Sequence, residues 1–514
     1  MDLLTVSPLL IIFVTAMVVL MVDLTLPRDR KGWCVGVALG GIVLAAFACW
    51  QLWNSDNQGF NRTVVADNFA LAFQFILLIV AALSIMLSER YIQSKGINFG
   101  EYYALLLFST SGAMLMAASR ELITIFIGLE VLSIALYVLS GFARTEARSE
   151  ESAMKYFLLG SFSSGFFLYG IALIYGGTGT TRLDLLPNVS AAMLMSPYAV
   201  AGFGLLIVGL GFKAAIVPFH AWTPDVYEGA PTSVTAFMSA GAKCGAFAAL
   251  IRIGVVLLSH NSLSAIFHDV FWVLAVLTMV VGNAVAIVQT NIKRMLAYSS
   301  IAHAGYILVG LLAGSSVYAN ANPEIRAQAY GGILFYILAY TFMNLGAFGI
   351  IILLARRNDE LNNIEDLQGL AASQPWAAAL MALFMFSLAG VPPAAGFFGK
   401  FYVFIAAVNA HEYSLAVIGL VASVIGAAYY LRIVYTMYFQ PAKRAFPTNV
   451  WRFAPGADIA LIISAILTLL FGVLPSGLYR TALSGASSLQ APSAIEQAAV
   501  VPSVPIPVKR ASIR

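Results

Sequence analysis

The sequence predicts an all-α polytopic membrane protein, and three observations carry this prediction. Of the 514 residues, 60% are hydrophobic and only 10% are charged, whereas soluble domains carry roughly 25% charged residues. The apolar residues gather in runs of about 20, the length that a helix needs to cross the hydrocarbon core. Prolines interrupt two of these runs. The net charge of +4 is too small to indicate nucleic-acid binding.

Fourteen transmembrane spans can be placed along the chain. We expect them at residues 7–26, 33–53, 67–87, 101–118, 121–142, 152–176, 198–219, 231–259, 267–289, 294–313, 328–355, 374–409, 413–439 and 457–479. No Lys or Arg precedes the first apolar run. We therefore expect no cleavable signal peptide, and the first span is retained.

Lysine and arginine are divided unequally between alternate loops. One set of loops holds fourteen of them: Arg28, Arg30, Lys31, Arg90, Lys95, Arg144, Arg148, Lys293, Arg294, Arg356, Arg357, Lys443, Arg444 and Arg452. The other set holds four: Arg62, Arg120, Arg182 and Arg326. Because loops rich in Lys and Arg stay in the cytoplasm, we expect both termini on the opposite, outer side.

The end of the chain and the cysteines indicate no further site. After Tyr479 the sequence becomes rich in Ala, Ser and Pro, so we expect residues 481–514 to form a disordered tail. Cys34, Cys49 and Cys244 lie in apolar runs, with no CxxC pair and no nearby histidine. We expect them to be packing residues, with no metal, haem, iron–sulfur cluster or disulfide.

Five ionisable residues fall well inside the predicted spans. They are Glu130, Lys213, Lys243, His303 and Lys400. A charge at the bilayer centre costs about 2.5–3.5 kcal/mol on insertion scales, so such groups need partners or water. Desolvation and neighbouring positive charges both favour the neutral amine of a buried lysine, and histidine titrates near neutral pH. Such a row can bind, transfer and release protons.

A structural role stays open for each of these residues. A single intramembrane lysine can extend to the interface or form a structural ion pair, and a histidine on an apolar helix is often a hydrogen-bonded core residue. Lys155 lies near the cytoplasmic end of its span, where structural and functional roles weigh equally. Arg252 and Arg432 lie toward span ends, where we expect them to be anchors.

Two spans should be broken. Residues 211–222 read GFKAAIVPFHAW and residues 387–404 read SLAGVPPAAGFFGKFYVF. Proline removes a backbone donor and clashes with the preceding turn, so we expect helix breaks at Pro218, Pro392 and Pro393. Irregular backbone at membrane depth is tolerated where it is buried in protein or lines a wet cavity.

The two breaks lie five spans apart, and so do Glu130 and His303. Because five is odd, a five-span unit repeated once has inverted topology, as in many transporters. We therefore expect a three-span segment at 1–100, five-helix repeats at 101–260 and 261–440, a C-terminal span at 441–480 and the tail. Lys213 precedes its proline and Lys400 follows its own, so coincidental prolines in two long helices remain an alternative.

Four segments together resemble the antiporter-like membrane subunits of proton-pumping NADH–quinone oxidoreductase, respiratory complex I. They are FIGLEVLSIALYVLSGF around Glu130, GFKAAIVPFHAWTPDVYEGAPTSVTAFMSAGAKCGAF, NIKRMLAYSSIAHAGY and SLAGVPPAAGFFGKFYVF. The likeness covers spans four to thirteen. The form PDVYEGAP and a lysine at position 400 favour the subunit N branch of this family.

The resemblance implies roles for matching residues. Glu130 would pair with Lys213, Lys243 would be the central relay lysine, and His303 would continue the polar axis. Lys400 would pass protons to the outer side or to a neighbouring subunit. Lys155 would modulate the Glu130 pair. His220 would lie near the cytoplasmic entrance, where a structural role is equally open.

The resemblance also implies partners and location. It places no cofactor on this chain, because NADH, FMN, iron–sulfur clusters and quinone belong to other subunits. The partners would be other membrane-arm subunits and the lipid bilayer, in a bacterial inner membrane. Two other functions stay open: a subunit of a multi-subunit cation/proton antiporter driven by ion gradients, and a non-pumping scaffold of the membrane arm.

Overall fold

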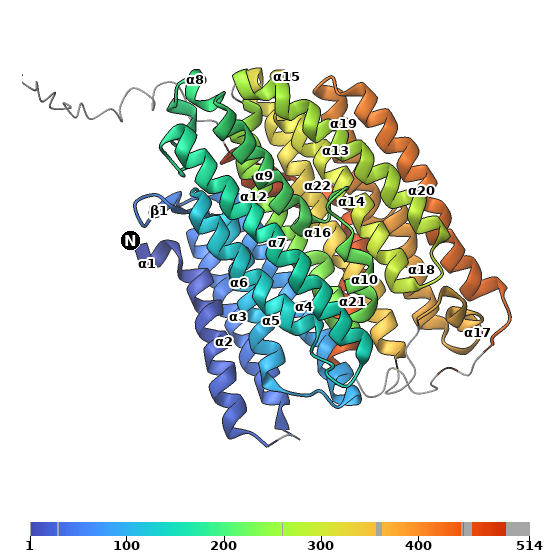
Figure 1. Cartoon of the computed structure of the whole chain (residues 1–514). Coiled ribbons are helices and arrows are strands. Elements are labelled where there is room, and N and C mark those ends of the chain that lie inside the picture. The colour runs from blue at the N-terminus through green and yellow to red at the C-terminus, as the bar shows by residue number, and fades with distance from the viewer. Residues whose placement is uncertain are drawn as a thin grey trace, which may run out of the picture.

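The computed structural model describes residues 2–27, 30–259, 261–355, 362–443, 446 and 455–489. Long helices run roughly parallel from one face of the molecule to the other (Figure 1). The first half of the chain forms α1 (Asp2–Thr5), α2 (Ser7–Thr25), α3 (Gly32–Leu52), α4 (Asn68–Lys95), α5 (Gly100–Ala118), α6 (Leu122–Ser140), α7 (Ala147–Thr178), α8 (Ala191–Leu194), α9 (Pro197–Ala214), α10 (Trp222–Gly229), α11 (Thr232–Phe237) and α12 (Lys243–Ser259).

The second half continues with another series of helices. It forms α13 (Asn261–Val288), α14 (Ile292–Gly314), α15 (Val317–Ala321), α16 (Pro323–Leu354), α17 (Leu370–Ser373), α18 (Pro375–Ala389), α19 (Ala395–Asn409), α20 (Tyr413–Phe439), α21 (Pro455–Val473) and α22 (Pro475–Ser487). The other described elements are η2 (Leu186–Asn188), η3 (Met238–Ala242), η4 (Ile364–Leu367) and an antiparallel hairpin of β1 (Asn57–Gly59) and β2 (Val64–Ala66).

Twelve helices among the described residues are long and apolar enough to cross a membrane. The prediction of an all-α polytopic membrane protein is therefore confirmed. The remaining two predicted spans correspond to α5 and to the pair of short apolar helices α18 and α19. The count of fourteen crossings and the limits of the repeats stay predictions.

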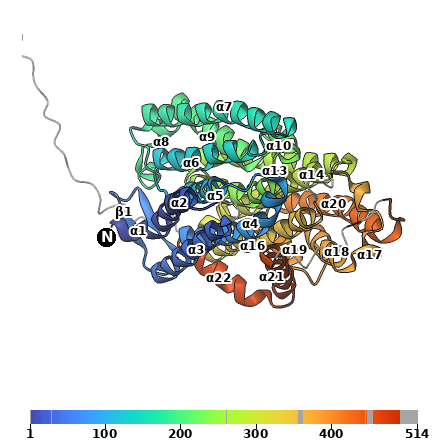
Figure 2. The ribbon, with the colours of Figure 1, turned by 90° about the horizontal axis from the view of Figure 1, so that it is seen from below.

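Burial separates central from peripheral helices. In α14, 94% of the most apolar stretch is buried, against 33% in α7. Seen from below, α6, α7 and α9 lie along one edge, α18 to α20 along another, and α21 with α22 along a third (Figure 2). The central helices α12, α14 and α16 are thus shielded by other helices, and the polar groups that they carry lie inside the protein.

Equivalent close approaches of helices recur 170 positions apart. A Cβ atom on Gly112 of α5 would collide with Leu132 N of α6, and a Cβ atom on Gly282 of α13 would collide with Ala302 N of α14. Only glycine leaves room for backbones at this separation. Gly112 and Gly282 are 170 positions apart, and so are Leu132 and Ala302. This agreement supports the predicted repeat.

The starts of two helices are also 170 positions apart, since Leu122 begins α6 and Ile292 begins α14. Each start is held by a backbone contact: Leu122 N donates to Thr181 O at 3.0 Å, and Ile292 N donates to Asn362 O at 2.9 Å. The two acceptors differ by 181 positions, so the helix starts fit the shift of 170 positions and the connections before them do not.

The same shift refines the comparison of Glu130 with His303, which lie five spans apart. A shift of 170 positions aligns Glu130 with Ser300, three residues before His303. Spacing in whole spans locates the helix that corresponds, but it does not give the residue, because helices of different length begin at different depths.

The two breaks give a second comparison between the predicted repeats. Ala215 and Gly390 adopt left-handed conformations, with φ of 60° and 89°, at the ends of α9 and α18. Aligning these two residues matches Lys400 with Asp225, and not with Lys213. This explains why one lysine precedes its proline and the other follows it.

The predicted disordered tail begins too early. Residues 481–487 belong to α22, which packs against α16 and α4. Its small residues Ala482, Gly485 and Ala486 are buried, and Ser488 Oγ accepts a hydrogen bond from Phe69 N at 2.9 Å. The small residues at the start of the predicted tail therefore allow close helix packing. Residues 490–514 lie outside the described part of the chain.

Replacing Gly112 by alanine should destabilise the protein by about 1–3 kcal/mol, the usual cost of overpacking. The new methyl group has no room beside Leu132 N, so α5 and α6 must separate. Gly165→Ala is the matched control, because no atom lies within 4 Å of its added Cβ. Thermal unfolding in detergent should show a lower melting temperature for Gly112→Ala and an unchanged one for Gly165→Ala. Equal melting temperatures of Gly112→Ala and the wild type would contradict the close approach.

Candidate functional site

Two broken helices organise the centre of the protein. α9 ends at Ala214 and the chain turns through Pro218 before α10, while α18 ends at Ala389 and α19 begins after Pro392 and Pro393. The predicted breaks are confirmed. Each break leaves carbonyl groups without an intrahelical donor, and these need other partners.

Lys213 lies in the last turn of α9, and its side chain is 2% exposed. Its Nζ donates to the hydroxyl of Tyr156 in α7 at 2.8 Å. The ammonium also lies 4.9 Å from the ring centroid of Tyr156 and 5.6 Å from that of Tyr137. Aromatic faces and a phenol oxygen therefore surround this lysine, an environment that stabilises a cation without a full counter-charge.

Glu130 lies in α6 and is half-buried. Its Oε1 accepts a hydrogen bond from Ser164 of α7. Among the ion pairs of the described residues, none joins Glu130 to Lys213. The expected direct pair is thus replaced by one phenol and one hydroxyl partner, since α7 lies against both helices and supplies both groups.

Lys243 is the first residue of α12 and is 5% exposed. It follows the π-helical segment η3. A π-turn adds a residue to the helix and often marks a functional site. The ammonium donates to the carbonyl oxygen of Ser300 in α14.

His303 lies one turn beyond Ser300 on α14 and is 1% exposed. One ring nitrogen, Nδ1, lies 2.5 Å from the hydroxyl of Tyr336 in α16. The other, Nε2, lies 3.0 Å from the hydroxyl of Tyr430 in α20. Both nitrogens of the imidazole are therefore placed for proton exchange with hydroxyl groups.

Lys400 lies in α19, with 7% exposure, and reaches back across the second break. Its Nζ donates to Leu388 O and Ala389 O, both at 2.9 Å, and to Ser423 Oγ at 2.8 Å. It also lies 5.3 Å from the ring centroid of Tyr306. The lysine thus binds the C-terminal carbonyls of α18, where a helix favours positive charge.

The candidate residues form two groups. Lys243, His303 and Lys400 all meet at α14. Lys243 binds the carbonyl oxygen of Ser300, His303 is itself a residue of α14, and Lys400 lies against the ring of Tyr306. Glu130 and Lys213 are joined instead by their separate contacts with α7. No hydrogen bond between described residues connects Lys213 directly to Lys243.

The two proposed modulators lie apart from this row. Lys155 is 42% exposed and pairs with Asp225 of α10 at 2.8 Å and with Glu151 at 2.7 Å, and none of the ion pairs among the described residues joins it to Glu130. His220 lies in the first break, and its buried Nδ1 has no hydrogen-bond partner among the described residues. The structure therefore places Lys155 in a peripheral ion-pair network.

Sequence reasoning missed the tyrosines of the site. Tyr156, Tyr306, Tyr336 and Tyr430 are each at most 2% exposed, and each contacts a candidate residue. A signal was present, because a tyrosine hydroxyl inside an apolar span must find a polar partner. Which partner it finds depends on helix packing and could not be predicted from one span.

The fold and site define a class: a polytopic membrane protein with two broken helices and a buried row of lysine and histidine. Residues 119–426 match the family described as NADH:quinone oxidoreductase/Mrp antiporter, TM. The chain belongs to this family.

Individual relatives agree with this assignment. The chain is 48% identical to NADH-quinone oxidoreductase subunit N of Trichlorobacter lovleyi, over 92% of this chain and 94% of that one. It superposes on a chain of respiratory complex I from Thermus thermophilus with a TM-score of 0.78 at 32% identity, covering 93% of this chain and all of that one. A chain of the Mrp complex from Dietzia has the same TM-score at 22% identity, over 97% and 98% of the two chains. That likeness shows the fold alone.

Asp225 should stabilise the protein in a pH-dependent way. Burial by itself would raise the pKa of this carboxyl, but hydrogen bonds and charges of Lys155 and Arg294 outweigh it and lower the pKa. A lowered pKa means that the stabilisation is complete above the ordinary carboxyl pKa near 4 and disappears as pH falls through the folded value.

Asp225→Asn should therefore melt below the wild type at pH 7, and the difference should vanish in strong acid. Because the carboxylate is partly exposed, the loss should be about 1 kcal/mol or less for each ion pair. Glu365→Gln is the control, since Glu365 pairs with Lys443 at a far more exposed site. A difference between Asp225→Asn and the wild type that is constant with pH would contradict the ion pairs.

Proposed function

We propose that this chain is the proton-translocating subunit N of an NADH–quinone oxidoreductase of the complex I type. Protons move along its buried lysines and histidine, and electron transfer in other subunits drives the movement. The observation that supports this proposal most directly is that Lys243, His303 and Lys400 all meet at α14. All three side chains are buried in the protein.

The order of the relay follows from these contacts. Lys243 lies against the carbonyl of Ser300, and His303 follows one helical turn later. Tyr306 continues the same helix and faces Lys400. In this hypothesis a proton passes from Lys243 to His303 and then to Lys400, with hydroxyl groups and water between them.

Water is expected where polar atoms lack protein partners. Ser300 Oγ, Tyr340 OH and Asn344 Oδ1 are buried and make no hydrogen bond of ordinary geometry with the described residues. All three lie on α14 and α16, the helices that carry His303 and Tyr336. Buried polar groups of this kind usually bind water, which would connect Lys243 with His303.

Glu130 and Lys213 form the control element of this proposal. A change in their interaction alters the local charge and hence the energy of a proton on Lys243. A potential of 100 mV opposes each charge by about 2.3 kcal/mol, and a pKa change of one unit corresponds to about 1.36 kcal/mol. Modest electrostatic changes of this kind are therefore sufficient to gate the step.

The setting of the chain completes the proposal. The chain lies in a bacterial inner membrane with both termini on the outer side, as the distribution of Lys and Arg predicts. Other membrane-arm subunits are its partners. The redox cofactors, FMN, iron–sulfur clusters and quinone, bind to those other subunits, and this chain carries none.

Lys243→Ala should abolish proton pumping while the complex still assembles, because the relay then loses its central group. NADH-driven acidification of membrane vesicles should fall at least about tenfold, as expected for loss of an acid–base group. Lys155→Ala is the control, since its peripheral ion pairs lie outside the relay. Undiminished pumping by Lys243→Ala would refute the relay.

A further inference from the structure

Two arginines bind the C-terminal ends of helices in the two predicted repeats. Arg252 of α12 donates from Nε to Ala117 O at 2.8 Å, at the C-terminus of α5, and pairs with Asp67 at 2.7 Å. Arg432 of α20 donates from Nη1 to Ile287 O at 2.8 Å, at the C-terminus of α13. The donors differ by 180 positions and the acceptors by 170, and each arginine lies on the last helix of its predicted repeat.

The corresponding helix ends lie on different faces. α5 ends at the predicted outer face and α13 ends at the predicted cytoplasmic face. The arginine-bound helix end is thus the outer one in the first predicted repeat and the cytoplasmic one in the second. In the proposed relay, a proton on Lys400 leaves through the outer half of the second repeat.

α13 and α20 meet along a seam that runs outward from the level of Ser423, the partner of Lys400. The two helices pack side by side. On α20, Glu412 lies just before the helix and 11 residues before Ser423, the partner of Lys400. Eleven residues are about three turns, or about 16 Å, so both lie on one face. On α13 the same spacing separates His268 from Met279.

The seam has an apolar constriction and a polar outer end. A Cβ atom on Gly419 would collide with the ring of Phe404 and lie 3.4 Å from Met279 Sδ, so these side chains fill the space beside Gly419. Phe404 follows Lys400 by one turn of α19 and is 5% exposed. Phe404, Met279 and Gly419 therefore form an apolar layer between Lys400 and the outer end of the seam.

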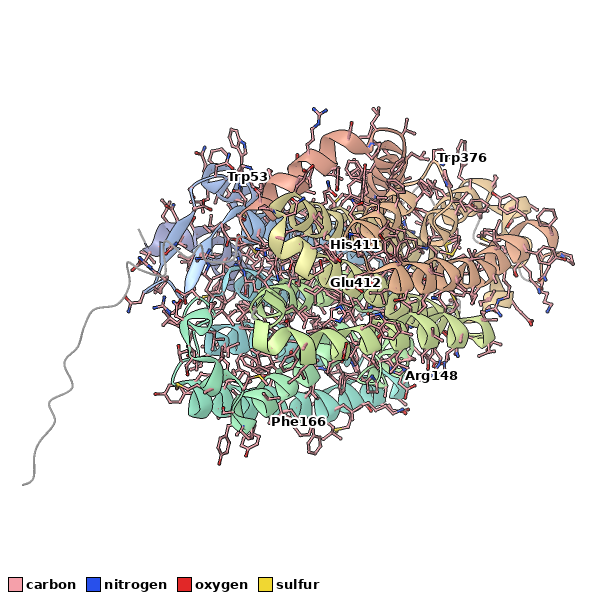
Figure 3. The ribbon with its side chains drawn as sticks, turned by 90° about the horizontal axis from the view of Figure 1, so that it is seen from above. Trp53, Arg148, Phe166, Trp376, His411 and Glu412 are labelled. Atoms are coloured by element: carbon pink, nitrogen blue, oxygen red, sulfur yellow. The ribbon has the colours of Figure 1, made fainter. Side chains whose placement is uncertain are left out.

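An imidazole and a carboxylate meet at the outer end of the seam. His268 Nε2 lies 2.8 Å from Glu412 Oε1, and the side chains are 33% and 15% exposed. Asp269 lies 3.5 Å from Nδ1. His411 precedes Glu412 on the same face (Figure 3) and contacts Tyr413 OH at 2.9 Å.

We propose that His268 and Glu412 form the site at which protons leave this subunit, and that Phe404 closes the passage from Lys400. The imidazole accepts a proton from water that passes Phe404 and releases it to water outside. Glu412 stabilises the imidazolium between these steps. This inference rests on the proposed function, because only a pumping subunit needs a release site.

The test is chemical rescue in vesicles that contain the complete complex. His268→Ala should slow coupled NADH–quinone reductase activity and the build-up of membrane potential by at least about tenfold, since positioned acid–base groups contribute roughly 10²–10⁴-fold. Added imidazole should restore both rates, because a free base can carry the proton. His411→Ala is the matched control, and both rates should stay unchanged with or without imidazole.

Each other outcome is decisive. Wild-type rates in His268→Ala, or a loss that imidazole does not restore, would overturn the proposal. Should His268→Ala fail to assemble, Glu412→Gln keeps the side-chain volume and must slow the same rates, and unchanged rates would overturn it as well. If Lys243→Ala abolishes pumping while His268→Ala and Glu412→Gln do not affect it, the release site fails and the proposed function stands.

Phe404→Ala tests the closure independently of electron transfer. Removing the ring opens the space beside Gly419, so passive proton conductance of the vesicles without NADH should increase about tenfold. That factor corresponds to about 1.4 kcal/mol at 25 °C. Phe401→Ala on the exposed side of α19 is the control. Equal conductance in all three proteins would contradict a constriction at Phe404.

Discussion

The cost of placing ammonium groups where neither bulk water nor lipid headgroups reach them governs this structure. The three buried candidate lysines, Lys213, Lys243 and Lys400, are bound by oxygen atoms that carry no full charge. Lys213 has a phenol, Lys243 has a carbonyl, and Lys400 has two carbonyls and a hydroxyl. Such partners stabilise the cation less than a carboxylate would. In the proposed relay this lets the lysines give up a proton, which a buried ion pair would prevent.

The helix breaks supply part of this oxygen environment. A continuous helix uses its carbonyls internally, whereas an interrupted one presents its last carbonyls to other groups. Lys400 binds the carbonyls that the break after Ala389 exposes. At the corresponding break after Ala214, the indole of Trp222 donates to Phe212 O at 2.8 Å. The carbonyls freed by a helix break thus bind the titratable amine of Lys400 in one predicted repeat and the indole N–H of Trp222 in the other.

Much of this architecture could be predicted from the sequence, because membrane crossing, helix breaking and charge burial act on short segments. Spans, proline breaks and the buried residues Lys213, Lys243, His303 and Lys400 follow from such local rules. Partners do not, since they depend on how helices from distant parts of the chain pack. Sequence therefore favoured a carboxylate for Lys213, whereas α7 supplies Tyr156. Register within the repeat and the π-turn before Lys243 also depend on packing.

A row of lysine and histidine conducts equally well in both directions, so direction must come from its ends. In the proposed mechanism, contacts near the outer end provide this asymmetry. Phe404 lies between Lys400 and the outer end of the seam, and the pair of His268 and Glu412 lies at that end. Arg252 and Arg432 bind helix carbonyls at places that the predicted inverted topology puts on opposite faces. In this mechanism a proton that enters through the first repeat crosses α14 to leave through the second, and the charge on Lys243 controls this lateral step.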